Sequence, residues 1–144
     1  MVIGAGVPYV AFAEGIGAVS VMRYDEPSWS YVDQAAISEG VSSQVSLDFF
    51  LGGPVVAYRD WINNFRLSVQ RFNGSSWEYL GDPGFTPDSV RFVSLATGNA
   101  AYYVAVSDAG SSNAVTVVRY QAPTMIFADG FESGGTALWS SAVP

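Results

Sequence analysis

The feature that most constrains the fold of this chain is a sequence repeat with a period of about 48 residues. The pentapeptide SVMRY at 20–24 returns as SVQRF at 68–72 and as TVVRY at 116–120, each time 48 positions later. Trp29 returns at the same spacing as Trp77. A fixed period of this size is typical of repeat architectures, in which one short supersecondary unit stacks on its neighbours.

Within each copy the sequence predicts β-strands. Short runs rich in Val, Tyr, Phe and Trp alternate with turn residues at 52–54, 73–76 and 81–84. Because no segment has a long apolar stripe at helical spacing, we expect almost no helix. Four strands in a unit of this length are typical of a β-propeller blade, and a small twisted sheet buries both faces only by packing on the next one. The prediction is an all-β, propeller-like array of about three four-stranded antiparallel blades.

The repeats divide the chain into parts. We expect propeller-type repeats over 1–123, in copies of approximately 1–44, 45–90 and 91–123, and a C-terminal tail over 124–144 that supplies a final strand.

The ends of the chain depart from a whole number of copies. Counting back from the second copy predicts that the first copy lacks its leading strand. In the third copy, TMIFADGF at 124–131 takes the place of the last strand, and ALWSSAV at 137–143 is a candidate for one more leading strand.

Three blades are fewer than the four to eight of an ordinary propeller. Two interpretations stay open. The chain is the C-terminal piece of a longer propeller, with upstream blades as its neighbours, or copies self-associate into a larger ring, most simply as a dimer with six blades.

Composition excludes several function classes. The chain has no Cys and no His, which excludes disulfides, thiolate nucleophiles, zinc sites built on these residues and a Ser-His triad. A net charge of −7 argues against nucleic-acid binding and weakens attraction to anionic membranes. The sparsely charged first 22 residues contain Gly and Pro and match later repeats, so we expect strands there rather than a signal peptide or a membrane span. We expect no cofactor and no metal.

The second copy carries a family resemblance. PVVAYRD at Pro54–Asp60 and RLSVQRFNGSSW at Arg66–Trp77 resemble tandem propeller repeats of large exported bacterial proteins, over residues 8 to about 121. The tail IFADGFESGGTALWS at Ile126–Ser140 is similar to a short segment at the C-termini of exported bacterial proteins, with Gly135 where Asp is commoner. The resemblance implies the C-terminal part of a secreted or cell-surface bacterial protein, and no defined activity.

Three kinds of residue recur at matching positions and are the candidate ligand-binding residues. They are an acid after the second strand, an arginine near the end of the third and a tryptophan in the fourth: Glu14, Asp60 and Asp108; Arg23, Arg71 and Arg119; Trp29 and Trp77. In a lectin-like interpretation they hold a glycan between blades, with the tryptophan against the sugar ring. The structural alternative, which we favour, is that the acid caps a turn, the arginine forms an ion pair and the tryptophan packs between sheets.

Catalysis and calcium binding are weaker interpretations. The carboxylate pairs Asp25 with Glu26, Asp82 with Asp88, and Asp129 with Glu132 fit a glycosidase, but no sialidase-type Asp box is present and nothing singles out one pair. Calcium ligands are available at Asp129 with Glu132 and at Asp60 with Asn63 and Asn64, without EF-hand spacing. We therefore expect a scaffold or binding module and not an enzyme.

Overall fold

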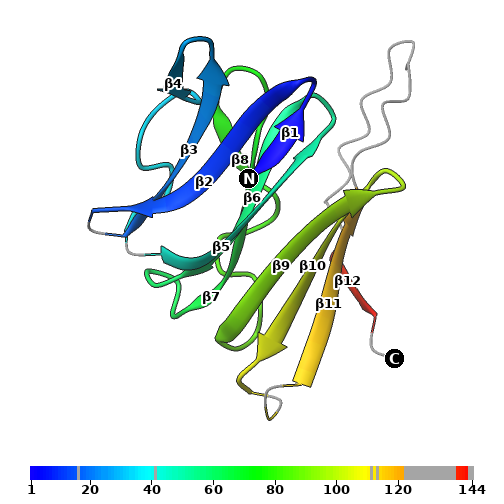
Figure 1. Cartoon of the computed structure of the whole chain (residues 1–144). Coiled ribbons are helices and arrows are strands. Elements are labelled where there is room, and N and C mark those ends of the chain that lie inside the picture. The colour runs from blue at the N-terminus through cyan, green and yellow to red at the C-terminus, as the bar shows by residue number, and fades with distance from the viewer. Residues whose placement is uncertain (16, 41, 111, 113, 122–138, 143–144) are drawn as a thin grey trace, which may run out of the picture.

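In a computed structural model of the chain, three four-stranded antiparallel sheets follow one another along the sequence (Figure 1). The structure describes residues 1–15, 17–40, 42–110, 112, 114–121 and the backbone of 139–142. Among these residues every regular element is a strand, so the predicted all-β class is confirmed.

Each sheet is a meander in which consecutive strands pair. Sheet 1 contains β1 (Val2–Gly4), β2 (Val7–Glu14), β3 (Ala18–Asp25) and β4 (Ser28–Tyr31). Sheet 2 contains β5 (Ser42–Phe50), β6 (Gly53–Asp60), β7 (Arg66–Phe72) and β8 (Trp77–Tyr79). Sheet 3 contains β9 (Val90–Gly98), β10 (Ala101–Asp108), β11 (Ala114–Gln121) and β12 (Trp139–Ala142).

The expectation that the first copy lacks its leading strand is wrong. β1 pairs with β2 through Val2↔Tyr9, Ile3↔Pro8 and Gly4↔Val7. The connecting residues Ala5 and Gly6 both have positive φ, 50° and 82°, as in the tight turns that suit the twist of a hairpin. Three residues are enough for this ladder because the turn fixes the register.

The same backbone turn recurs in the first hairpin of every sheet, although its residues differ. Leu51 and Gly52 have φ of 50° and 83°, and Asn99 and Ala100 have φ of 48° and 55°. Each pair contains one residue that adopts this region readily, glycine in AlaGly and LeuGly and asparagine in AsnAla, but the position and the partner of that residue differ. The repeat is therefore closer in conformation than in residue identity.

The last strand of sheet 3 comes from another segment than expected. β12 lies antiparallel to β11, with Val117↔Ala142 and Tyr120↔Trp139. Residues 139–142 of the segment considered as a further leading strand thus form the fourth strand of sheet 3. The segment 124–131, expected in that place, lies outside the described residues.

Sheet 2 lies between sheets 1 and 3 (Figure 1). The leading strands of sheets 2 and 3 make the main contacts between sheets. β5 contacts β1, β2 and β3 of sheet 1 and β9 of sheet 3, and β9 also contacts β6 and β7 of sheet 2. Two side chains of β5 bond to β9. Ser46 Oγ accepts a hydrogen bond from Leu95 N at 2.9 Å, and Asp48 Oδ2 accepts one from Thr97 N at 2.8 Å.

Two apolar cores fill the spaces between the sheets. One joins Tyr9, Val19 and Val21 of sheet 1 to Val56 and Tyr58 of sheet 2. The other joins further side chains of sheet 2 to sheet 3, namely Val55, Ala57, Leu67 and Val69 with Leu95, Tyr102, Val104 and Val106. Because β6 supplies side chains to both cores, nearly all of it is buried, whereas an exposed sheet face would carry polar residues at alternate positions.

Candidate functional site

Asp60, the recurring acid of sheet 2, is buried and accepts hydrogen bonds from residues of its own hairpin. Its Oδ2 accepts hydrogen bonds from Ser68 Oγ at 2.7 Å and from Asn63 Nδ2 at 2.9 Å. Ser68 Oγ in turn accepts a hydrogen bond from Gly84 N at 2.8 Å. The acid therefore connects the β6–β7 hairpin, through the serine, to the loop that follows β8.

The acids of the other sheets follow the same arrangement to different degrees. Glu14 accepts hydrogen bonds from Ser20 Oγ at 2.9 Å and from the Tyr31 hydroxyl, and Ala36 N donates to Ser20 Oγ at 2.9 Å. Asp108 is less buried and accepts a hydrogen bond from the backbone N–H of Gly110 at 2.9 Å, which caps the turn after β10. These contacts match the structural alternative.

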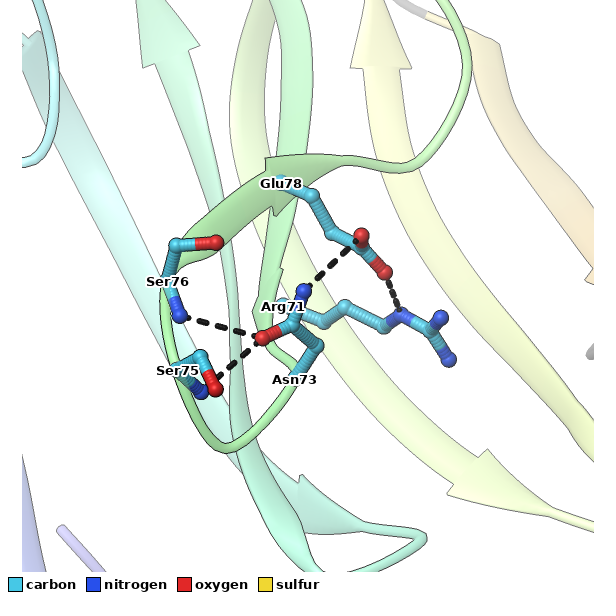
Figure 2. A network of polar contacts seen from close by, with 5 residues as sticks. All are labelled: Arg71, Asn73, Ser75, Ser76 and Glu78. Carbon is cyan, nitrogen blue, oxygen red and sulfur yellow. Dashed lines mark hydrogen bonds and ion pairs between the residues drawn. The ribbon is translucent and has the colours of Figure 1, made fainter.

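Arg71, the recurring arginine of sheet 2, forms an ion pair with Glu78 across the β7–β8 hairpin (Figure 2). Asn73 Nδ2 donates to the other oxygen of Glu78 at 3.2 Å, and Asn73 Oδ1 accepts from the backbone N–H groups of Ser75 and Ser76 at 2.9 and 3.0 Å. Partial burial lowers the pKa of Arg71, but the hydrogen bond to Glu78 and the charge of this carboxylate outweigh the effect of burial and leave the pKa raised. The guanidinium holds the hairpin in shape.

The other two arginines make equivalent local contacts. Arg23 Nε lies 2.7 Å from Asp25 Oδ2 on an exposed surface. A hydrogen bond from Ser30, and then the Arg23 charge, hold the pKa of Asp25 below its usual range. Arg119 donates to the Gln121 side chain and lies over the ring of Tyr103, 5.9 Å from its centroid.

The two recurring tryptophans differ in what they contact. Trp77 connects sheet 2 to sheet 1, because its Nε1–H donates to the carbonyl oxygen of Val32 at 2.9 Å. Its ring also lies 5.7 Å from that of Phe72. Trp29 lies 5.5 Å from Tyr24 in its own sheet and is 41% exposed.

The recurring residues of one copy do not converge on one point. Asp60 pairs with Arg66 at one end of β7, and Arg71 lies at the other end, about 17 Å along the strand at roughly 3.3 Å per residue. Arg71 pairs with Glu78 and Phe72 pairs with Trp77, so Arg71 and Trp77 point to opposite faces of sheet 2. In sheet 2, the acid, the arginine and the tryptophan therefore do not form one pocket.

A cavity of about 450 Å³ lies instead between sheets 1 and 2, and the sequence did not predict it. The loop after β4 supplies one wall, and β7 and β8 with the turn between them supply the other. Its lining residues are Asp33, Gln34, Ala36, Ile37, Ser38, Glu39, Gln70, Ser76, Trp77 and Tyr79. Of the eight candidate ligand-binding residues, Trp77 alone lines it.

The floor of this cavity is a connected set of polar groups. Gln70 is buried, and its Nε2 donates to the Tyr58 hydroxyl at 2.6 Å and to the carbonyl oxygen of Ile37 at 3.2 Å. The Tyr58 hydroxyl donates to that of Tyr79 at 3.5 Å. Burial, and then the contact with Tyr79, raise the pKa of Tyr58 far above that of an exposed tyrosine, so this hydroxyl stays neutral.

The rim of the cavity carries exposed carboxylates, those of Asp33 and Glu39. Two carboxylates, an amide and two aromatic rings suit hydrogen bonding to hydroxyl groups together with contact to an apolar surface. A comparison of the repeats does not reveal this site. The lining segment DQAAISE at 33–39 aligns with GDPGFTP at 81–87 in the second copy, and the two segments differ in their side-chain chemistry.

Two of the acids considered for catalysis or calcium binding are held by neighbouring side chains. Asp25 is bound by Arg23 and Ser30, and Asp60 by Ser68 and Asn63, while Asp129 and Glu132 lie outside the described residues. Within the described ranges, no group of three or more acidic side chains could hold a metal ion. No helix capable of crossing a membrane occurs in this part of the chain.

Comparison of the chain with protein-family models, with curated proteins and with solved structures finds no match. The resemblance of the repeats to those of exported propeller proteins therefore stays a prediction.

Proposed function

We propose that this chain is a non-catalytic repeat module of the β-propeller type, part of an exported bacterial protein, that serves as a scaffold or binding module. The proposal rests on the contacts of the recurring polar residues. In sheet 2, Asp60 accepts a hydrogen bond from Ser68, and Arg71 forms an ion pair with Glu78, so both side chains bind to their own sheet. A catalytic carboxylate needs access to a substrate and an environment matched to proton transfer. Asp60 is 5% exposed and accepts two hydrogen bonds from its own sheet.

The propeller arrangement is supported by how the sheets meet. The main contacts between sheets are made by β5 and β9, so the sheets approach one another at their leading strands. Blades of a propeller have this arrangement around a central axis, and a ring of four to eight is needed for closure. Further blades of a longer chain or a second copy of this chain would complete the ring. Export rests on the resemblance of the repeats and of the tail at 126–140.

A screen for turnover tests the non-catalytic assignment. Wild-type protein is incubated with a panel of aryl glycosides and oligosaccharides, and we expect no product above a heat-denatured control. Turnover that disappears in Glu39→Gln or Asp33→Asn, with the unfolding transition unchanged, would contradict the proposal, because these exposed carboxylates line a cavity that also contains aromatic residues.

A second function, carbohydrate binding, is favoured by the cavity between sheets 1 and 2. Trp77 and Tyr79 offer aromatic surface, and Gln70, Asp33 and Glu39 offer hydrogen-bonding groups. A glycan array tests it. Binding that is lost in Tyr79→Ala and Glu39→Gln but kept in Arg71→Ala would place a sugar in this cavity, since Arg71 faces the other side of the sheet. Binding that is lost only in Arg71→Ala would place the glycan site on the opposite face of sheet 2. If the wild type binds no glycan, the scaffold function is the one that remains.

A further inference from the structure

Each sheet of this chain has two different faces, and sheet 2 shows how both are used. Its following face, toward sheet 3, contains Val55, Ala57, Leu67 and Val69, each at most 1% exposed. Its preceding face, toward sheet 1, contains Val56, Tyr58, Phe72 and Trp77. Both contacts between neighbouring sheets therefore join a following face to a preceding face.

Among the described residues, no sheet packs on the following face of sheet 3. Counting 48 positions on from the following face of sheet 2 gives Tyr103, Ala105, Val115 and Val117. Val115 is 72% exposed and Val117 is 42% exposed, whereas their counterparts Leu67 and Val69 are buried. Val115 and Val117 point to the same face of β11, and contiguous exposed apolar residues mark interaction surfaces when they form a patch.

A shallow hollow on the same face adds to this observation. It has a volume of about 230 Å³, and its lining includes Phe92, Ser94, Ala105 and Val115. Phe92 is itself 67% exposed. The face thus offers an apolar recess of the size that one large side chain fills.

The preceding face of sheet 1 is the complementary surface. The repeat places Val10, Phe12, Tyr24 and Trp29 at the positions that Val56, Tyr58, Phe72 and Trp77 occupy in sheet 2. Trp29 is 41% exposed, and Val10, Phe12 and Tyr24 are half-buried, although Val56 and Tyr58 are fully buried. Ile3, the counterpart of Phe49, is 59% exposed. Phe49 itself packs on Tyr9 of sheet 1, with ring centroids 5.2 Å apart.

We propose that the following face of sheet 3 docks on the preceding face of sheet 1 of a second copy of this chain. The contact would reproduce the two interfaces inside the chain, which join the same pair of faces. It is a head-to-tail contact, because the two surfaces that meet are different. If two such contacts close on each other, two chains give six sheets, a number within the range of closed propellers.

Two full-length variants and a matched control test the docking by light scattering on size exclusion. Wild type is expected to run at twice the 15.3 kDa of one chain. Val117→Arg and Trp29→Glu each place a charge in the proposed contact, and each should weaken association at least about tenfold. Leu51→Asp makes a similar apolar-to-charged change at a 60% exposed turn residue of sheet 2, and should leave the mass unchanged. Near-ultraviolet circular dichroism and the milder Val117→Ser variant show whether a loss of association comes from misfolding.

Mixing the two charged variants gives the decisive result. Val117→Arg keeps an intact sheet 1 face, and Trp29→Glu keeps an intact sheet 3 face, so the mixture regains one wild-type contact and should return to twice the chain mass. A wild type that stays at the mass of one chain at all concentrations would overturn the proposal. So would a dimer whose dissociation constant is the same as that of the wild type in either variant alone, because that dimer would use other surfaces or one face twice.

Discussion

Replacement of Asp60 separates a structural role of the recurring acid from a ligand-binding role. Asp60→Ala removes the acceptor of the hydrogen bonds from Ser68 at 2.7 Å and from Asn63 at 2.9 Å. A hydrogen bond to a charged group contributes about 1.5–3 kcal/mol, and Ser68 is buried and cannot turn to water. Asn63 is only partly buried and can regain water, so its bond counts for less. The expected loss in the free energy of unfolding is about 2–4 kcal/mol.

The repeat provides its own control. Asp108 occupies the same position in sheet 3 but accepts one described hydrogen bond, from an exposed backbone N–H. Asp108→Ala should therefore cost about 1 kcal/mol or less, as the loss of a cap does. Asp60→Asn keeps the shape and one acceptor oxygen, and should fall between the two alanine variants.

Urea unfolding followed by tryptophan fluorescence measures these differences. Stability is compared at constant m-value, so that a change in midpoint reports stability alone. The reasoning would be refuted if Asp60→Ala and Asp108→Ala had equally small effects. It would also be refuted if Asp60→Ala left stability intact and instead removed binding to a glycan.

Further predictions concern the core, the contact between sheets and the surface charge. Leu67→Ala should lower the free energy of unfolding by about 2–5 kcal/mol, measured by urea titration, because Leu67 is fully buried between sheets 2 and 3. Trp77→Phe keeps an aromatic ring but loses the hydrogen bond to Val32, and should cost about 1 kcal/mol in the same assay. The carboxyl carbon of Asp25, followed by NMR, should titrate below the usual midpoint of about 3.9. Its folded-state pKa is lowered, so any stability it adds is present above that midpoint and is lost as the pH falls through the folded value. Ser30→Ala should move the titration upward, and an unchanged midpoint would show that Ser30 is not the cause.

The sequence predicted the period, the strands and most turns, because each depends on local features. A short apolar run rich in Val, Tyr and Phe defines strands such as Val7–Glu14, and Asn73 with Gly74 defines a turn. The leading strand of sheet 1 was missed because counting back one period from Val45–Leu47 falls at or before Met1, which leaves only the short segment Val2–Gly4 for this strand.

The site was harder to predict than the fold because it depends on which face each side chain takes. Arg71 and Trp77 are six residues apart in sequence, yet the pairing of Arg71 with Glu78 and of Phe72 with Trp77 puts them on opposite faces. The cavity between sheets 1 and 2 joins Glu39 to Gln70 and Tyr79. It arises from the stacking of two copies, which the sequence of either copy alone does not specify.

The repeats of this chain stack face to face, and recurring residues such as Trp77 connect the sheets. Nuclear Overhauser spectroscopy of the ¹⁵N-labelled full chain tests this stacking through the indole proton of Trp77. We expect cross-peaks from this proton to Val32, which directly follows β4, and to the neighbouring residues of sheet 1. We also expect slower exchange with water than for Trp61, which is 56% exposed in a turn. Cross-peaks to Phe72 of its own sheet alone, with exchange as fast as that of Trp61, would contradict the stacking.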